Sequence, residues 1–269
     1  MRRLTLSLLG PTVILFDGRP IAHLTTKTQA LLCYLAVEAE RPHRRTSLSG
    51  LLWPQQPEET ARNNLRQALH QLQRSIGEGF LLITPQTAQF NQASDHSLDV
   101  AQFIALVAEC QAHPHRSCDV CRACIKRLQG AADLYRGDLL ADFFLKDSAP
   151  FEEWGLVKRQ QLARMALSTL QFLAAYHGRR GEYAQMEQMA RRQLALDAFR
   201  EEAHHQVMRA LAWSGQRNAA LAQYTAYRGL LKQEFGVEPS RETAHLYEQI
   251  CAEKLEPPCL PLATHARFR

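Results

Sequence analysis

Residues 58–74 read EETARNNLRQALHQLQR, and the spacing of their apolar side chains decides the fold of the first part of the chain. In an amphipathic helix, positions i, i+3 and i+4 share one face. On this period the apolar residues that gather on one face are Ala61, Leu65, Ala68, Leu69, Leu72 and Ile76. The other side carries arginine, asparagine, glutamine and histidine. We therefore predict a helix that begins near Pro57 and ends at Gly77.

The segments on either side of this helix complete a recognisable order. Residues 1–22 predict two or three short strands, with a turn at Asp17-Gly18. Residues 27–40 predict a first helix, and a short second helix follows, with Thr46 as its cap and Pro54 as its end. Two further strands are expected at 80–83 and 87–90, around Pro85-Gln86. Strands, three helices and a closing hairpin are the order of a winged helix.

The rest of the chain has a helical pattern almost throughout. The helices predicted from the apolar period cover residues 99–111, 119–135, 151–177, 182–196, 200–213, 217–234 and 241–254. Gly181 and Gly215 each open a similar pair of helices, 215 − 181 = 34 residues apart, which is the tetratricopeptide period. We predict a mostly α protein: an α+β winged helix-turn-helix domain over 1–96, an all-α tetratricopeptide-like domain over 97–256, and a flexible tail over 257–269.

Composition and motifs exclude several classes of function. The formal net charge is +5 among 269 residues, so the placement of charge matters more than its total. No stretch of about 20 apolar residues occurs, and the basic start at Arg2-Arg3 has no cleavage signature after it, which predicts a cytoplasmic protein without a membrane partner. The sequence has neither a phosphate-binding Gly-x-x-x-x-Gly-Lys-Ser/Thr loop nor a Gly-x-Ser-x-Gly elbow. We expect a protein that is not an enzyme.

The polar side of the 58–76 helix has the side chains that bind DNA. Arginine, asparagine and glutamine present forked or bidentate donors, which recognise base edges and hold phosphates in a major groove. The residues predicted to contact DNA are Arg62, Asn63, Arg66, Gln67, His70 and Arg74. A solvated face of an ordinary amphipathic helix is the alternative. The helix before it and the hairpin after it favour a recognition helix.

Five stretches in this order resemble the bacterial transcriptional activator family related to the SARP antibiotic-pathway regulators. They are residues 51–54 (LLWP), 61–66 (ARNNLR), 86–91 (QTAQFN), 134–140 (LYRGDLL) and 235–240 (FGVEPS). The resemblance covers residues 1–250. It implies a transcription activator of the bacterial nucleoid that binds direct repeats in double-stranded promoter DNA as a homodimer and contacts RNA polymerase.

The sequence departs from the family in two places. Residues 47–50 (SLSG) stand where more acidic, better helix-forming residues are expected, and the hairpin at 80–90, the expected wing, has no arginine or lysine. Wing contacts with DNA are therefore in doubt. A different class of function also stays open: a tetratricopeptide scaffold whose winged helix docks on protein. Binding to DNA at physiological salt separates the two.

A second group of residues, rich in cysteine and histidine, predicts a structural zinc site. Zinc in proteins is held by cysteine and histidine, often with a Cys-x-x-Cys pair. The candidate ligands are Cys110, His113, His115, Cys121 and Cys124. Cys118 competes, because Cys118-x-x-Cys121 has the same spacing. Cysteines packed against neighbouring helices, with no metal, are the alternative. A closed site would stabilise the helical domain without catalysis.

Overall fold

The computed structural model describes residues 3–21, 23–114 and 121–257. Predictions for His115, Cys118 and nearly all of the tail, residues 258–269, lie outside these ranges. Within these ranges the fold is mostly helical, and the small sheets are confined to the first hundred residues, as the sequence predicts. The chain divides into two compact units: Met1–Pro114 with Gly130–Arg164, and His115–Gln129 with Met165–Arg269.

The described residues of the first unit form two small sheets. One has the strand order β3-β2-β1-β7 and the other β4-β6-β5. The strands are β1 (Leu4–Ser7), β2 (Val13–Phe16), β3 (Arg19–Pro20), β4 (His43–Arg44), β5 (Leu81–Ile83), β6 (Thr87–Phe90) and β7 (His96–Leu98). β1 and β2 pair antiparallel, whereas β7 pairs parallel to β1, with Leu6 opposite Leu98. The sequence predicts β1 to β3, β5 and β6, but it does not predict β4 or β7.

The helices α1 (Thr26–Val37), α2 (Arg45–Leu52) and α3 (Glu58–Ile76) pack against one another in this unit. The buried residues of α3 are the six predicted from its apolar period: Ala61, Leu65, Ala68, Leu69, Leu72 and Ile76. The predicted cap of the second helix is wrong. Thr46 lies inside α2, because β4 keeps Arg44 extended and the helix begins directly after it, with no side-chain cap.

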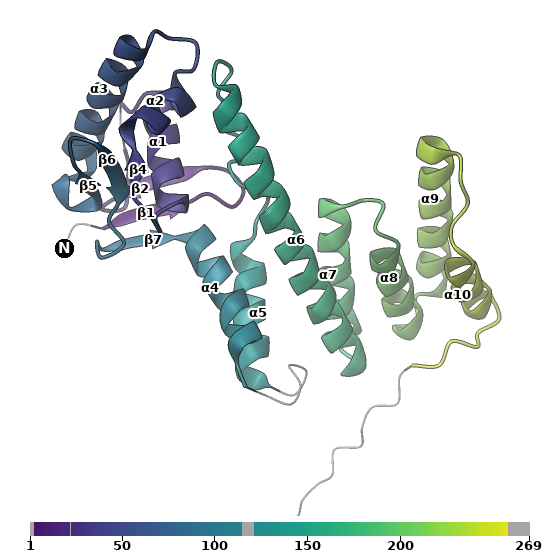
Figure 1. The fold of residues 1–269 in the computed structure, drawn as a ribbon. Helices are drawn as coiled ribbons and strands as arrows, with labels where there is room; N and C mark the ends of the chain where they lie inside the picture. The colour runs from purple at the N-terminus through teal and green to yellow at the C-terminus, as the bar shows by residue number, and fades with distance from the viewer. Residues whose placement is uncertain (1–2, 22, 115–120, 258–269) are drawn as a thin grey trace, which may run out of the picture. The chain divides into compact units, whose positions relative to one another are not determined.

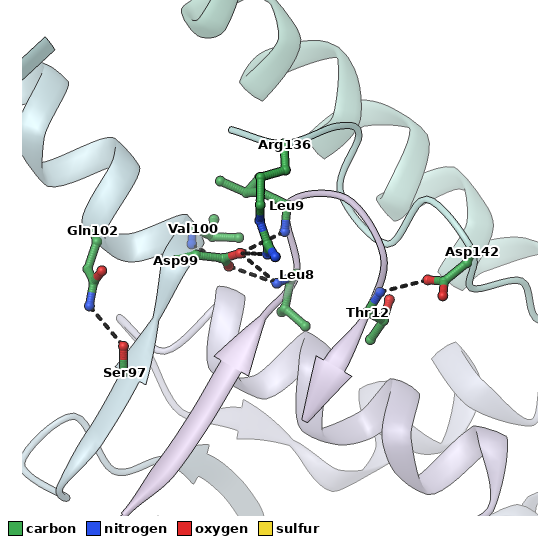
Figure 2. Close-up of polar contacts among 9 residues, drawn as sticks. All are labelled: Leu8, Leu9, Thr12, Ser97, Asp99, Val100, Gln102, Arg136 and Asp142. Carbon is green, nitrogen blue, oxygen red and sulfur yellow. Dashed lines mark hydrogen bonds and ion pairs between the residues drawn. The ribbon is translucent and has the colours of Figure 1, made fainter. Parts of the chain in front are cut away.

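A buried carboxylate joins the winged helix to the chain that follows it (Figure 2). Asp99 is the first residue of α4 (Asp99–Ala112), and its side chain is 8% exposed. It accepts backbone N–H bonds from Leu8 at 2.8 Å, from Leu9 at 2.9 Å and from Val100 at 2.8 Å. The Arg136 guanidinium donates a fourth contact at 3.2 Å. One carboxylate thereby accepts hydrogen bonds from backbone N–H groups just after β1 and at the start of α4.

The LYRGDLL stretch, residues 134–140, docks on the loop after β1. Leu9 and Leu139 form an antiparallel bridge, and the Leu140 N–H donates to the Leu8 carbonyl at 2.8 Å. Gly10 has φ +107°, and a side chain at Gly137 would lie 3.3 Å from its Cα. The backbones can approach this closely because both residues lack Cβ atoms. The motif that resembles the family thus serves to attach this segment to the winged helix.

The second unit contains two helix pairs, each opened by a glycine as predicted. The pairs are α7 (Tyr183–Leu196) with α8 (Glu201–Trp213), and α9 (Arg217–Phe235) with α10 (Arg241–Cys251), as Figure 1 shows. Gly181 and Gly215 both have positive φ, +74° and +79°, a conformation that favours glycine. The core of these helices contains Ala190, Val207, Met208, Leu211, Ala220, Leu246 and Ile250.

Two helices lie between α4 and α7 in the chain, α5 (Arg122–Leu134) and α6 (Ala149–Arg179). α6 is 31 residues long, which is enough to cross a bilayer by length alone. It contains several charged residues, however. Among the described residues, no helix combines the length and the apolar character that a membrane span needs.

Candidate nucleic-acid interface

All six side chains predicted to contact DNA are exposed on α3. They are Arg62, Asn63, Arg66, Gln67, His70 and Arg74. The face is exposed because the opposite face fills the core against α1 and α2, with Leu65 and Leu72 fully buried. Gly77, at φ +90°, ends the helix after Ile76. The acidic residues of α3 are both in its first turn, so the rest of the exposed face has no acid.

One of these arginines is already engaged within the helix. The Arg62 guanidinium lies 2.5 Å from the Glu58 carboxylate, four residues before it. Both side chains are well exposed, so the pair contributes little stability, typically below about 1 kcal/mol. A phosphate could therefore replace Glu58 as the partner of Arg62 at small cost. No ion pair of Arg66 occurs among the described residues.

A basic crevice lies beside α3, and the sequence does not predict it. Its volume is about 690 Å³. Its lining comes from β4, the start of α2, the first half of α3 and the β5–β6 turn: Arg44, Arg45, Thr46, Arg62, Asn63, Leu65, Arg66, Pro85, Gln86 and Thr87. Four of these residues are arginines and none is acidic, which suits a phosphate backbone. We call this lining the arginine crevice.

Strand β4 explains why Arg44 and Arg45 belong to the crevice. Arg44 pairs with Thr87 of β6, and the Arg45 N–H donates to the Gln86 carbonyl at 2.9 Å. The Arg45 guanidinium also reaches the Thr84 carbonyl at 3.4 Å. The hairpin itself has no arginine or lysine, but β4 places two arginines against its turn. A signal was present in the sequence, since residues 43–45 read HRR just before a helix.

The β5–β6 turn is held in one shape by its threonines. The Thr84 N–H donates to the Thr87 carbonyl at 2.9 Å, and the Thr87 N–H donates to the Thr84 hydroxyl at 2.9 Å. The two hydroxyl groups lie 2.8 Å apart. Pro85 and Gln86 occupy the tip. A turn fixed in this way keeps Gln86 beside Arg45.

The predicted metal ligands that the structure describes are divided between the two compact units. Cys110, buried in α4, and His113 belong to the first unit, and Cys121 and Cys124 belong to the second. His115 and Cys118 lie outside the described residues. The zinc site stays a prediction.

Among comparisons with known proteins, one matches the helical part of the chain and others match most of its length. The family model described as "Bacterial transcriptional activator domain" matches residues 98–251. The regulatory protein AfsR of Streptomyces coelicolor is 27% identical over 92% of this chain, and the regulatory protein DnrI of Streptomyces peucetius is 27% identical over 91%. The transcriptional regulatory protein EmbR of Mycobacterium tuberculosis is 25% identical over 94%.

The matches differ in how much of each relative they cover. This chain spans 24% of AfsR and 64% of EmbR, but 91% of DnrI. A solved structure of Mycobacterium tuberculosis EmbR, in complex with a low-affinity phosphopeptide, aligns with a TM-score of 0.68 at 20% identity. That alignment covers 96% of this chain and 68% of the EmbR chain, and it shows that the two share a fold.

Proposed function

This chain belongs to the bacterial transcriptional activator domain family, whose named relatives are transcriptional regulators, and we propose that it regulates transcription by binding specific promoter sequences through α3. The observation that carries this proposal is the arginine crevice beside the exposed face of α3. Base-reading donors and phosphate-binding arginines there lie on one surface of one compact unit.

The roles within this surface follow from chemistry. Both Arg66 and Asn63 lie on the exposed face of α3. In a major groove, arginine can donate two hydrogen bonds to a guanine edge, and asparagine can both donate to and accept from an adenine edge. Arg62, beside Glu58, and Arg74, in the last turn of α3, would bind phosphates. Gln67 and His70 lie between them. We further propose that two copies bind direct repeats and that the protein activates transcription by contacting RNA polymerase.

Arg44 and Arg45 lead to a testable prediction of their own. Replacing both with alanine should weaken binding to every DNA sequence by the same factor, because contacts with phosphates carry no sequence information. The slope of log Kd against log salt should fall by about one for each phosphate that the variant no longer binds. Fluorescence anisotropy over a salt series measures both quantities. A weakening confined to one preferred sequence would contradict the phosphate role.

Selection of DNA fragments tests the proposed function as a whole. The full chain is incubated with genomic fragments at about 150 mM salt, and bound fragments are sequenced. We expect enrichment of a motif that occurs twice in the same orientation. Arg241→Ala, an exposed arginine of α10, is the control and should keep the enrichment. A folded chain that enriches no fragment would contradict DNA binding and favour a protein-docking scaffold.

A further inference from the structure

We propose that a second basic hollow, on the opposite side of α3 from the arginine crevice, binds the phosphates of the second DNA strand. This inference rests on the proposed function, because it takes α3 to enter a major groove. The hollow has a volume of about 740 Å³ and lies within the first compact unit. It is lined by residues 25–28, Trp53, residues 144–147 and the middle of α3. We call it the lysine hollow, after Lys27 and Lys146.

The rotation of the α-helix places the two hollows on opposite flanks of α3. Successive residues of an α-helix are turned by about 100° around its axis. Arg62 and Arg66, which line the arginine crevice, therefore point in directions about 40° apart. Asn64 and Gln71, which line the lysine hollow, point in directions about 20° apart, roughly 170° from the arginine pair. The exposed face, with Arg74 near its centre, lies between the two flanks.

A helix in the major groove lies between two phosphate backbones. The groove is about 12 Å wide, so an α-helix that fills it can approach both strands at once. With the exposed face of α3 toward the base edges, the arginine crevice faces one strand and the lysine hollow faces the other. Gln67, which the sequence predicts to contact DNA, is exposed and lines the lysine hollow. Each hollow therefore belongs to a different strand.

The lysine hollow has the side chains that bind phosphates. The Lys27 ammonium lies 2.8 Å from the Asp147 carboxylate and 5.6 Å from the centre of the Trp53 ring, and these contacts hold it in place. Lys146 is exposed and has no ion pair in the part of the chain that the structure describes. Lysine and threonine side chains both bind phosphate oxygens in protein–DNA complexes. Thr26, also exposed, adds a hydroxyl group to the lining.

Asp147 lowers the positive charge of the lysine hollow and provides the first test. Asp147→Asn removes a charge that repels phosphate and keeps the size of the side chain. We expect the variant to bind preferred and scrambled duplexes roughly two- to fivefold more tightly than the wild type, because one repulsive contact is lost. Asp133→Asn, an exposed acid of α5 outside the hollow, is the matched control and should change both affinities much less. Equal affinities in the two variants would overturn the proposal.

Lys146→Ala tests which strand the lysine hollow binds. Each phosphate of a preferred duplex is replaced in turn with an uncharged methylphosphonate, and the affinity of the full chain is measured by fluorescence anisotropy. We expect wild-type binding to weaken when phosphates beside the motif are replaced on either strand. Lys146→Ala should lose this sensitivity on one strand, and the double variant of Arg44 and Arg45 should lose it on the other. Lys232→Ala, an exposed lysine of α9 in the other compact unit, should keep both.

The outcomes separate this inference from the proposed function. A wild-type chain that binds no duplex would overturn both. Binding that Lys146→Ala leaves unchanged, or loss of sensitivity on the same strand in both variants, would overturn the lysine hollow alone. Lys146 and Asp147 are exposed, so their substitution should leave the fold intact, which circular dichroism checks.

Discussion

Replacing Asp99 with alanine is expected to lower the free energy of unfolding by about 3–5 kcal/mol. The carboxylate is buried and accepts the N–H groups of Leu8 and Leu9, two residues that are fully buried themselves. Alanine would leave these amides without partners, and each unsatisfied buried donor costs about 1–3 kcal/mol. The Arg136 guanidinium would also lose its partner. Urea unfolding followed by circular dichroism measures the change in stability.

A matched control is Asp142, which follows the same 134–140 stretch that carries Arg136. Its carboxylate accepts the Thr12 N–H at 2.8 Å (Figure 2), but Asp142 is exposed. Because water can replace an exposed partner, Asp142→Ala should cost less than about 1 kcal/mol. The same comparison tests the role of burial. Equal destabilisation in Asp99→Ala and Asp142→Ala would show that Asp99 is not the main link between the winged helix and the segment at 134–142.

Replacing Arg66 with alanine is expected to weaken binding to the preferred DNA site by about 5- to 150-fold, or 1–3 kcal/mol. Arg66 lies on the exposed face of α3 and lines the arginine crevice, so it can approach a base edge with both ends of its guanidinium. Removing a bidentate contact affects the matching sequence most. Binding to a scrambled duplex should change much less, since phosphate contacts remain.

Titration of both duplexes by fluorescence anisotropy gives the two affinities. Arg241→Ala on α10 removes the same charge from an exposed position of the other compact unit, and it should leave both affinities near the wild-type values. Equal weakening on the preferred and the scrambled duplex would instead assign Arg66 to a phosphate. In that case another residue of the exposed face would make the sequence-specific contact with a base, and Asn63 would be the first to test.

Local sequence patterns were sufficient to predict the helices. They were not sufficient to predict which distant parts of the chain pair with one another. α3 could be predicted because 19 residues repeat one period, and the core selects its apolar face. β7 has three residues and no period, and it pairs with β1 about 90 residues earlier in the chain. The hydrogen bonds of Asp99 could not be predicted for the same reason, because its partners Leu8 and Leu9 are equally distant in sequence.

The candidate interface likewise has one part that the local sequence predicts and another that depends on strand pairing. The exposed face of α3 followed from its sequence alone. Arg44 and Arg45 were missed because their place beside the wing depends on the pairing of β4 with β6, and a two-residue strand has no detectable alternation. The absence of basic residues from residues 80–90 suggested a wing without DNA contacts. The fold instead brings basic side chains to the wing from another segment.

A dimethyl sulfate footprint of the full chain on a selected duplex tests the central claim most directly. Guanine N7 lies in the major groove and adenine N3 in the minor groove, so the reagent reports which groove is occupied. With α3 in the major groove, we expect protection of guanine N7 within each copy of the motif, and disappearance of that protection in Arg66→Ala. Bound DNA whose guanine N7 atoms all stay reactive would contradict the placement of α3 in the major groove.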